Sequence, residues 1–387
     1  MMRRRTHEHL RIAMVGTRGM PANYGGVETV VDVLSRQLVA RGHEVTVFCR
    51  SEDYEHHPPM IDGVKLVYLP ASQSPGIGAM IHAFRAAVYC IGRDFDVIHF
   101  HALGPGMMSI ISRLLTRSTV VVTVHGRDDK RDKWGRGARL VLRFAASVSA
   151  RVPHSTLVVS ETLAHEYADE FQRSTTVVPN STHAIPNVAP GSTLTRYGLS
   201  PQKYFISVGR LVPEKAPHEM IAGYLSAMTD MSLVVVGGAA GTEEYVDHLK
   251  EMAAGCSAVI FTGPLYGEEL AEILTNAGAF VTSSHLEGLP TALIEAGRAA
   301  LPIIASDIDP HCEILDTTTG TDGRRVYPTG DTEALSELFG LVESGYDDES
   351  FGAKLLASEL DDRYAPARTG EVHEQAYLAA IGSRHRR

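Results

Sequence analysis

Two glutamates in one segment of the chain have types and a spacing that suit sugar recognition. Glu287 lies in the loop 283–290, and Glu295 follows it inside an expected helix that begins at Thr291. An apolar run precedes the loop, so both carboxylates are expected at the carboxyl edge of a sheet. Carboxylates accept hydrogen bonds from vicinal hydroxyls, such as those of a ribose or a hexose. In the alternative interpretation, Glu295 compensates the helix dipole and Glu287 is a surface residue, and spacing alone does not decide.

Two cations occupy a similar position earlier in the second half of the chain. Arg210 and Lys215 follow the apolar run 204–208 directly, within the stretch GRLVPEK. Cations at the end of a strand can converge on a diphosphate, which accepts charge-assisted hydrogen bonds. The alternative is a solvated pair of cations beside Glu214.

A glycine-rich loop follows the first apolar run of the chain. Residues 16–29 read GTRGMPANYGGVET, with Gly16 at the end of the run and Gly25 and Gly26 before an expected helix. Glycines let backbone N–H groups approach an anion, and a helix N-terminus adds positive potential. The loop fits neither GxGxxG nor GxxxxGK[ST], which disfavours a dinucleotide site and a P-loop. The alternative is a sharp loop that uses glycine for steric reasons alone.

These loops must be carried by alternating strands and helices. Apolar runs predict strands at 11–15, 44–49, 65–69, 97–100, 120–124 and 156–159, and again at 204–208, 232–236, 259–262, 279–282 and 302–305. Longer amphipathic stretches predict helices that include 28–40, 79–92, 107–115, 217–227, 242–254, 267–276 and 291–299. Continuous apolar strands are typical of parallel sheets that helices cover on both faces.

The pattern therefore predicts an α/β protein with two doubly wound, Rossmann-like domains. Pro, Gly, Asn, Ser and Thr cluster at 186–200, which places the domains at 1–190 and 191–365, followed by a helical segment at 366–387. Two such domains facing each other would enclose a central cleft suited to a substrate.

Composition excludes several classes of protein. The 387 residues are 44% hydrophobic and 21% charged, which is too apolar for disorder, and no apolar run is long enough to span a membrane. The four cysteines are far apart without a CxxC, which disfavours a disulfide scaffold or a zinc knuckle. Residues 1–190 hold 22 Lys and Arg against 17 Asp and Glu, whereas residues 191–387 hold 14 against 29. The acidic half is a poor nucleic-acid binder, and the basic half suits phosphates or an anionic membrane.

Three further patterns are open to a chemical and a structural interpretation. Asp307 and Asp309 spell DxD, a signature of some metal-nucleotide sites, but here the pair follows a core strand of the second domain. His99 and His101 share one face of a strand, and we favour packing or an acceptor contact over a metal pair. The basic segment 128–151 contains Trp134, which would anchor in a headgroup layer or pack in the core.

Taken together, the segments resemble the GT-B glycosyltransferases of family 4, which are retaining enzymes that use nucleotide-sugar donors. The resemblance covers nearly the whole chain. It rests on Gly25-Gly26, His125-Gly126, VVPN at 177–180, GRLVPEK at 209–215, VVGG at 235–238, FTGPLYGEEL at 261–270 and the pair Glu287 and Glu295. GTRGMPANYGGVET with HGRDDKRDKWG is similar to a subgroup linked to bacterial polysaccharide synthesis, some of whose members are rhamnosyltransferases.

The resemblance implies catalytic roles for four side chains. Arg210 and Lys215 would clamp the diphosphate and stabilise the leaving nucleotide. Glu287 would hold hydroxyls of the donor sugar, and His125 would lie against that sugar near the reacting carbon.

It also implies roles in binding. Glu295 would bind the ribose hydroxyls. Backbone groups at Gly288, Leu289 and Thr291 would assist at the phosphates, and the loop from Gly263 to Leu265 would meet the base. Gly16, Gly25 and Gly26 would form a loop beneath the donor phosphate and the acceptor. The segment 366–387 would return to the first domain.

The sequence departs from the family pattern at a few positions. Ala216 and Ser181 stand where glycine is usual, Val27 stands where the subgroup often has an aromatic residue, and Gly297-Arg298 replaces Met-Ala. These changes leave the charged residues intact, so they bear on acceptor detail more than on activity.

The expected function is retaining transfer of a hexose or deoxyhexose, rhamnose included, from a nucleotide-diphospho-sugar to a glycan acceptor. We expect no cofactor, no metal and no nucleic-acid partner. The acceptor is expected to be lipid-linked, with the enzyme cytoplasmic and peripheral at the inner face of the plasma membrane. The alternatives are a GT-B sugar-nucleotide 2-epimerase and a non-catalytic nucleotide-sugar or carbohydrate-binding protein.

Overall fold

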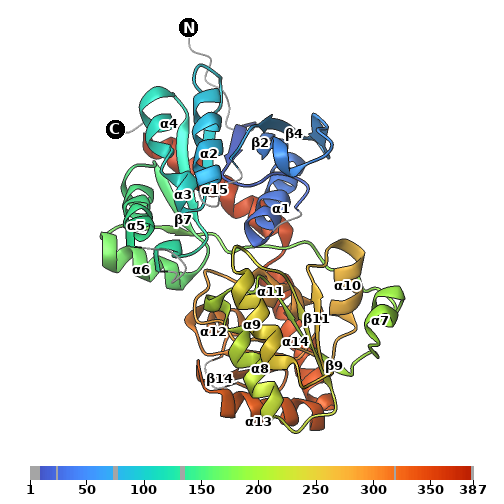
Figure 1. Ribbon diagram of the computed structural model, residues 1–387. Coiled ribbons are helices and arrows are strands. Elements are labelled where there is room, and N and C mark those ends of the chain that lie inside the picture. Colours follow the sequence, from blue (N-terminus) through green and yellow to red (C-terminus); the bar gives the residue numbers. More distant parts are fainter. Residues whose placement is uncertain (1–8, 23–24, 73–76, 131–135, 318–319, 385–387) are drawn as a thin grey trace. The chain divides into compact units, whose positions relative to one another are not determined.

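The chain forms two compact units (Figure 1). This computed structural model describes residues 9–22, 25–72, 77–130, 136–317 and 320–384, apart from the side chains of Arg136 and Ala138. Unit 1 contains the residues up to His183 and those from Tyr364 onward, and unit 2 contains Ala184–Arg363. The segment between 184 and 191 belongs to unit 2 because it is bonded there. Asn276 donates to the carbonyl of Val188 at 2.8 Å, and the amide of Gly191 donates to Glu272 at 2.8 Å.

Unit 1 is built on an eight-stranded sheet with the order β3-β4-β2-β1-β5-β6-β7-β8. All neighbouring strands are parallel except β3 and β4. The strands are β1 Arg11–Val15, β2 Glu44–Arg50, β3 Met60–Ile61, β4 Val64–Leu69, β5 Val97–His101, β6 Thr119–Val124, β7 Ser155–Val158 and β8 Thr176–Val177. The main helices are α1 Gly26–Ala40, α2 Ile77–Tyr89, α3 Leu103–Gly106, α4 Ser109–Leu115, α5 Arg136–Arg151, α6 Glu161–Phe171 and α15 Pro366–Arg384.

Alternation along β1 divides the core of unit 1 into two layers. Ile12 and Met14 pack in the cluster that contains Leu34 of α1 and Tyr377 of α15. Ala13 and Val15 point the other way, into the cluster that α2 covers. Side chains on a strand alternate between its faces, so helices lie on both sides of this sheet. The C-terminal helix α15 is thereby part of unit 1, where it packs beside α1.

Unit 2 has a six-stranded parallel sheet with the order β11-β10-β9-β12-β13-β14. The strands are β9 Tyr204–Val208, β10 Ser232–Val236, β11 Val259–Gly263, β12 Ala279–Thr282, β13 Ile303–Ser306 and β14 Arg324–Tyr327. The helices are α7 Ser192–Tyr197, α8 Pro217–Ser226, α9 Glu243–Ala253, α10 Gly267–Thr275, α11 Thr291–Arg298, α12 Asp309–Leu315, α13 Thr332–Ser344 and α14 Tyr346–Arg363, with the 3₁₀ turn η3 Pro213–Lys215 before α8.

The architecture confirms the prediction of two Rossmann-like α/β domains. Three short strands were not predicted, because β3 and β8 have two residues each and β14 reads RRVY. No helix in the described ranges combines the length and hydrophobicity that crossing a bilayer requires.

Candidate active site

The predicted donor residues of unit 2 gather where its strand order reverses. From β9 the chain proceeds outward to β10 and β11, and then returns to the other side of β9 with β12, β13 and β14. In open α/β sheets the carboxyl ends of the strands flanking such a point form the usual ligand crevice. The loop that follows β9 carries Arg210 and Lys215, and the loop that follows β12 carries Glu287.

Lys215 and Glu287 contact each other directly. The Nζ atom of Lys215 lies 2.8 Å from Oε1 of Glu287, and the hydroxyl of Ser284 donates to the same oxygen at 3.0 Å. Burial opposes ionisation of Glu287, but Lys215 and Ser284 outweigh it and hold the pKa of this carboxyl below its ordinary value. Glu287 is therefore a carboxylate at neutral pH, and it is already oriented by two donors.

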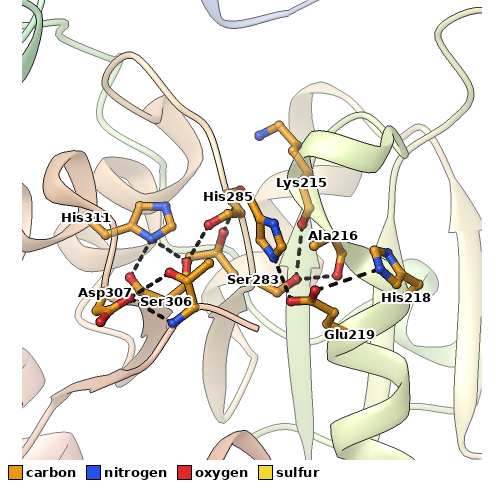
Figure 2. Close-up of polar contacts among 12 residues, drawn as sticks. Lys215, Ala216, His218, Glu219, Ser283, His285, Ser306, Asp307 and His311 are labelled. Carbon is orange, nitrogen blue, oxygen red and sulfur yellow. Dashed lines mark hydrogen bonds and ion pairs between the residues drawn. The ribbon is translucent and has the colours of Figure 1, made fainter. Parts of the chain in front are cut away.

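Backbone contacts tie the two loops together (Figure 2). The hydroxyl of Ser283 donates to the carbonyls of Lys215 and Ala216 at 3.1 and 2.8 Å. The amide of His285 donates to the carbonyl of Glu214 at 2.9 Å. The Nε2 atom of the His285 ring lies 2.8 Å from a carboxylate oxygen of Glu219 in α8. These contacts make the geometry around Lys215 depend on β12 as well as on its own strand.

Glu295 lies in the second turn of α11, and its environment differs from that of Glu287. Burial raises the pKa of Glu295 to about 7, against which Arg298 acts only weakly. At the start of α11, Pro290 supplies no side-chain cap, Gly288 and Leu289 are buried, and Thr291 is half-buried. The first N–H groups of a helix have no partners within the helix, so this turn can receive an anion.

Two other predicted donor positions lie on the same edge of the sheet. Gly263 is the last residue of β11, and Leu265 follows it as a buried residue. Arg210 stands half-buried two residues after β9. The structure thus brings the expected donor set to one edge of unit 2 and joins Lys215 directly to Glu287.

In unit 1 the predicted glycine loop also lies at a reversal of strand order, between β1 and β5. Gly16 follows β1 with φ of 105°, and a Cβ atom on it would lie 2.4 Å from the carbonyl oxygen of His101. Only glycine allows this approach. Gly25 precedes α1 and Gly26 is its first residue, so the loop leads into a helix N-terminus as expected.

His125 follows β6 and belongs to a group of four histidines. Its Nε2 lies 3.1 Å from Nδ1 of His101, and the His101 ring packs at a tilt against His99 with a centroid separation of 4.0 Å. Burial lowers the pKa of His125 to about 4, so the imidazole is neutral at physiological pH.

The C-terminal helix completes this group. His373 of α15 lies 5.9 Å from the ring of His99, and the Tyr377 hydroxyl lies 2.8 Å from His99 Nδ1. His99 also contacts the Thr123 hydroxyl at 2.6 Å through Nε2. Packing therefore accounts for His99, while His101 contacts a predicted catalytic residue. Among the described residues no group of three or more His, Cys, Asp or Glu is arranged to hold a metal ion.

The DxD sequence has a structural explanation. Asp307 accepts hydrogen bonds from the amide and the hydroxyl of Thr329 at 2.8 and 2.7 Å, and these bonds lower the pKa of its carboxyl. Asp309 is the first residue of α12. The Asp307 carboxylate thus links the ends of β13 and β14.

Two residues near the donor site carried no sequence signal. Ser284 orients Glu287, and His311 of α12 is fully buried, with Nδ1 donating to the carbonyl of Ser306 at 2.9 Å (Figure 2). Isolated serine and histidine residues are common in folded proteins, so only the strand order reveals that they lie near this site.

Contacts in the structure explain two departures from the family pattern, and a backbone angle bears on a third. A Cβ atom on Gly297 would lie 2.4 Å from Cδ1 of Leu360, so glycine lets α14 pack closely on α11. Ser181 is buried and donates to the carbonyl of Tyr364 at 2.6 Å. Ala216 has φ of 44°, which explains why glycine would also suit this position. Nothing in the structure explains Val27.

Comparisons with known proteins match most of each unit. Residues 24–184 match the family described as Glycosyltransferase Family 4, and residues 197–350 match Glycosyl transferases group 1. The chain is a family 4 glycosyltransferase with the GT-B fold.

Named relatives and solved structures cover most of this glycosyltransferase. It is 26% identical to the O-antigen chain mannosyltransferase C of Escherichia coli, over 85% of this chain and 87% of the relative. It is 28% identical to a GDP-mannose-dependent alpha-mannosyltransferase of Mycobacterium tuberculosis, over 78% and 82%. Sucrose-phosphate synthase from Thermosynechococcus elongatus has the same fold, with a TM-score of 0.80 at 18% identity over 96% of this chain and 100% of that one. The UDP-glucose complex of Anabaena HepE gives a TM-score of 0.76 at 15% identity, over 97% and 100%.

Proposed function

We propose that this glycosyltransferase transfers a hexose or deoxyhexose from a nucleotide-diphospho-sugar to a glycan acceptor, with retention at the anomeric carbon. The observation that carries the proposal is the contact of Lys215 with Glu287 at the strand reversal of unit 2. A cation and an oriented carboxylate at that point suit the two parts of the donor, a diphosphate and a polyhydroxylated ring.

Each donor-site residue has a distinct part in the proposed reaction. Arg210, Lys215 and the first turn of α11 stabilise the negative charge that develops on the leaving nucleotide diphosphate. Glu295 accepts hydrogen bonds from the ribose hydroxyls, and Glu287 accepts them from the donor sugar. Neutral His125 lies against the transferred sugar. No metal takes part, because the cations carry out the charge neutralisation.

Retention is proposed to occur by attack of the acceptor on the same face that the nucleotide leaves. None of the donor-site side chains stands out as a nucleophile, and Oε1 of Glu287 is engaged by Lys215 and Ser284. The acceptor hydroxyl then loses its proton to the departing phosphate, and the bond from the sugar to the nucleotide is replaced by one to the acceptor.

The relatives' names guide the choice of donor. The names of the mannosyltransferases of Escherichia coli and Mycobacterium tuberculosis suggest mannose as the donor sugar, and the second name specifies GDP-mannose. The motif resemblance favours rhamnose. The acceptor is proposed to be lipid-linked, as suits polysaccharide synthesis.

A donor panel tests the proposal. UDP-, GDP-, ADP- and dTDP-sugars, with mannose and rhamnose among them, are measured for saturable binding and for slow hydrolysis without acceptor. Product NMR then gives the anomeric configuration. Failure of every nucleotide-sugar to bind would contradict the donor site, and an inverted product would contradict the mechanism. An epimerised sugar nucleotide formed without acceptor would favour the 2-epimerase instead.

A further inference from the structure

Three neighbouring helices of unit 1 expose large apolar side chains. Helices α2 and α4 are in contact, as are α4 and α5 (Figure 1). We call their exposed large hydrophobic residues, together with Ile91 just after α2, the outer apolar face, which consists of Ile77, Phe84, Val88, Ile91, Leu114, Leu115, Leu140, Val141 and Phe144. Leu114 and Leu140 are 75% and 69% exposed. Proteins seldom expose such clusters without a partner for them.

In helix α2 the larger apolar side chains face outward although smaller ones fill the interior. Its inner side carries Ala83, Ala86 and Ala87, which are fully buried against the sheet, and the buried His82. Its outer side carries Phe84 and Val88, which are 50% and 44% exposed. An ordinary surface helix has its larger apolar residues inward and polar residues outward. The outer residues of α2 therefore suit an apolar environment beyond the protein.

The charge of the three helices is of one sign. Helices α2, α4 and α5 contain no Asp or Glu, although the chain has 46 of them. Exposed arginines on or beside these helices are Arg85, Arg113, Arg117, Arg139, Arg143 and Arg151. Within the described residues, neither Arg113 nor Arg143 forms an ion pair with a carboxylate. At the edge of the outer apolar face, beyond the end of α2, Oδ2 of Asp94 lies 3.6 Å from Nη2 of Arg11.

We propose that the outer apolar face docks this glycosyltransferase on a bilayer with anionic headgroups. The apolar side chains would enter the boundary between headgroups and acyl chains, with the arginines at the level of the phosphates. The acidic second half of the chain would be repelled by the same surface, so docking is through unit 1. The proposal deepens the proposed function, on which it rests for the lipid-linked acceptor.

The docking residues coincide only in part with the basic segment 128–151 that the sequence suggested. Arg131, Lys133 and Trp134 lie outside the described residues. Lys130 is described, but it pairs with Glu166 at 2.9 Å, so its charge is compensated. Leu140, Val141 and Phe144 of α5 lie within the predicted segment 128–151, whereas the exposed residues of α2 and α4 lie outside it, in helices that were expected only to cover the sheet.

Vesicle co-sedimentation of the full chain tests the proposal. The vesicles contain phosphatidylcholine alone or with phosphatidylglycerol, at about 0.1 M and about 1 M salt. One variant combines Phe84→Ser, Leu114→Ser and Leu140→Ser, and its control combines Phe351→Ser and Leu355→Ser, exposed apolar residues of unit 2. A second variant combines Arg113→Gln and Arg143→Gln, and its control combines Lys65→Gln and Arg368→Gln.

We expect the wild type and both controls to bind the anionic vesicles more strongly than the neutral ones. The arginine variant should bind the anionic vesicles roughly 30-fold more weakly at low salt and match the wild type at high salt. The apolar variant should bind more weakly at both salt concentrations.

Three results would overturn the proposal. The first is negligible binding of the wild type to either kind of vesicle, and the second is unchanged binding of the apolar variant. The third is that the wild type binds no lipid but is an oligomer, which the apolar substitutions convert to a monomer. The last would make the face a contact between copies of the chain. Nucleotide-sugar hydrolysis without acceptor should be the same in all variants, so loss of docking is distinguishable from failure of the proposed transfer.

Discussion

Nζ of Lys215 lies 2.8 Å from Oε1 of Glu287, so a cation from the loop after β9 holds a carboxylate from the loop after β12. The Lys215 and Glu287 side chains are only 23% and 12% exposed, and Ser284 contributes a second donor. A mostly buried pair of this kind is costly to break from one side, because the remaining charge has no compensation. The donor site is therefore held in place before a ligand arrives.

Replacing Lys215 should remove most of the transferase activity. We expect Lys215→Met to lower kcat/KM by roughly 100- to 1000-fold, because one group that stabilises the leaving diphosphate is lost. The pKa of Glu287 should rise at the same time, since burial is then opposed only by weaker partners. Steady-state kinetics at several pH values measure both effects.

Arg196 supplies the matched control for that variant. It pairs with Glu269 at 2.8 Å on the surface of unit 2, so Arg196→Met should leave activity unchanged. Wild-type kcat/KM in a correctly folded Lys215→Met protein would disprove the assignment of Lys215 to the donor site.

Glu295 should make donor binding depend on pH. Its pKa of about 7 means that it is largely protonated below neutrality in the free enzyme. If ribose hydroxyls donate to the carboxylate, affinity should fall as pH decreases from 8 to 6, and binding should release a proton near pH 6.5. Calorimetry in buffers with different ionisation enthalpies measures this release. Glu295→Gln should lose affinity and flatten the pH dependence.

The same shift has a consequence for stability. Because the pKa of folded Glu295 lies above its ordinary value of 4.5, its protonated form is the favoured one in the fold. That contribution is complete below pH 4.5 and is lost as pH rises through about 7. Glu295→Gln should therefore stabilise unit 2 more at pH 8 than at pH 5, as urea unfolding would show. Equal effects at both pH values would contradict the raised pKa.

His125 should not titrate in the working range. Its pKa of about 4 makes it neutral from pH 6 to 8. We therefore expect His125→Ala to lower kcat without moving the inflection near pH 7 that Glu295 gives to the pH profile of activity. His101→Phe should lower kcat as well, because it removes the ring nitrogen that contacts His125 at 3.1 Å, whereas His101→Asn should retain more activity. Parallel pH profiles of the three variants measure this, and an inflection that moves in His125→Ala would contradict it.

Activity should persist without divalent metal. Oδ1 of Asp307 accepts two hydrogen bonds from Thr329, and Arg210 and Lys215 supply the positive charge that a metal would otherwise provide. We expect full transfer in EDTA, and Asp309→Asn should behave as the wild type. Loss of activity in EDTA that Mg²⁺ or Mn²⁺ restores would instead assign a metal to Asp307 and Asp309.

Gly297 should be intolerant of a side chain as long as Leu360 is present. In an ordinary helix, replacing Gly by Ala gains about 1 kcal/mol, but here the added Cβ would lie 2.4 Å from Leu360 Cδ1. We expect Gly297→Ala to destabilise unit 2 by about 1 kcal/mol in the wild type and to stabilise it by a similar amount in a Leu360→Ala background. Unfolding midpoints of the four proteins complete the cycle, and equal effects in both backgrounds would rule out the contact.

Much of the fold was accessible from the sequence, because strands buried on both faces need continuous apolar runs. The stretches Tyr204–Val208, Ser232–Val236 and Ala279–Thr282 have the bounds that were predicted. A loop that follows such a run lies at the carboxyl edge of the sheet, so Lys215, Glu287 and Gly16 could be placed at that edge from order along the chain alone.

The tertiary structure alone decided which of these loops meet. Lys215 reaches Glu287 because β12 returns to pair with β9, and Tyr377 reaches His99 because the chain re-enters unit 1 after an entire second domain. Strand order and chain return depend on the packing of the whole molecule, which no local pattern records. The outer apolar face was hidden for a related reason. The stretch 79–92 was predicted as a helix, but only packing against the sheet reveals that Ala83, Ala86 and Ala87 of α2 face inward while Phe84 and Val88 face outward.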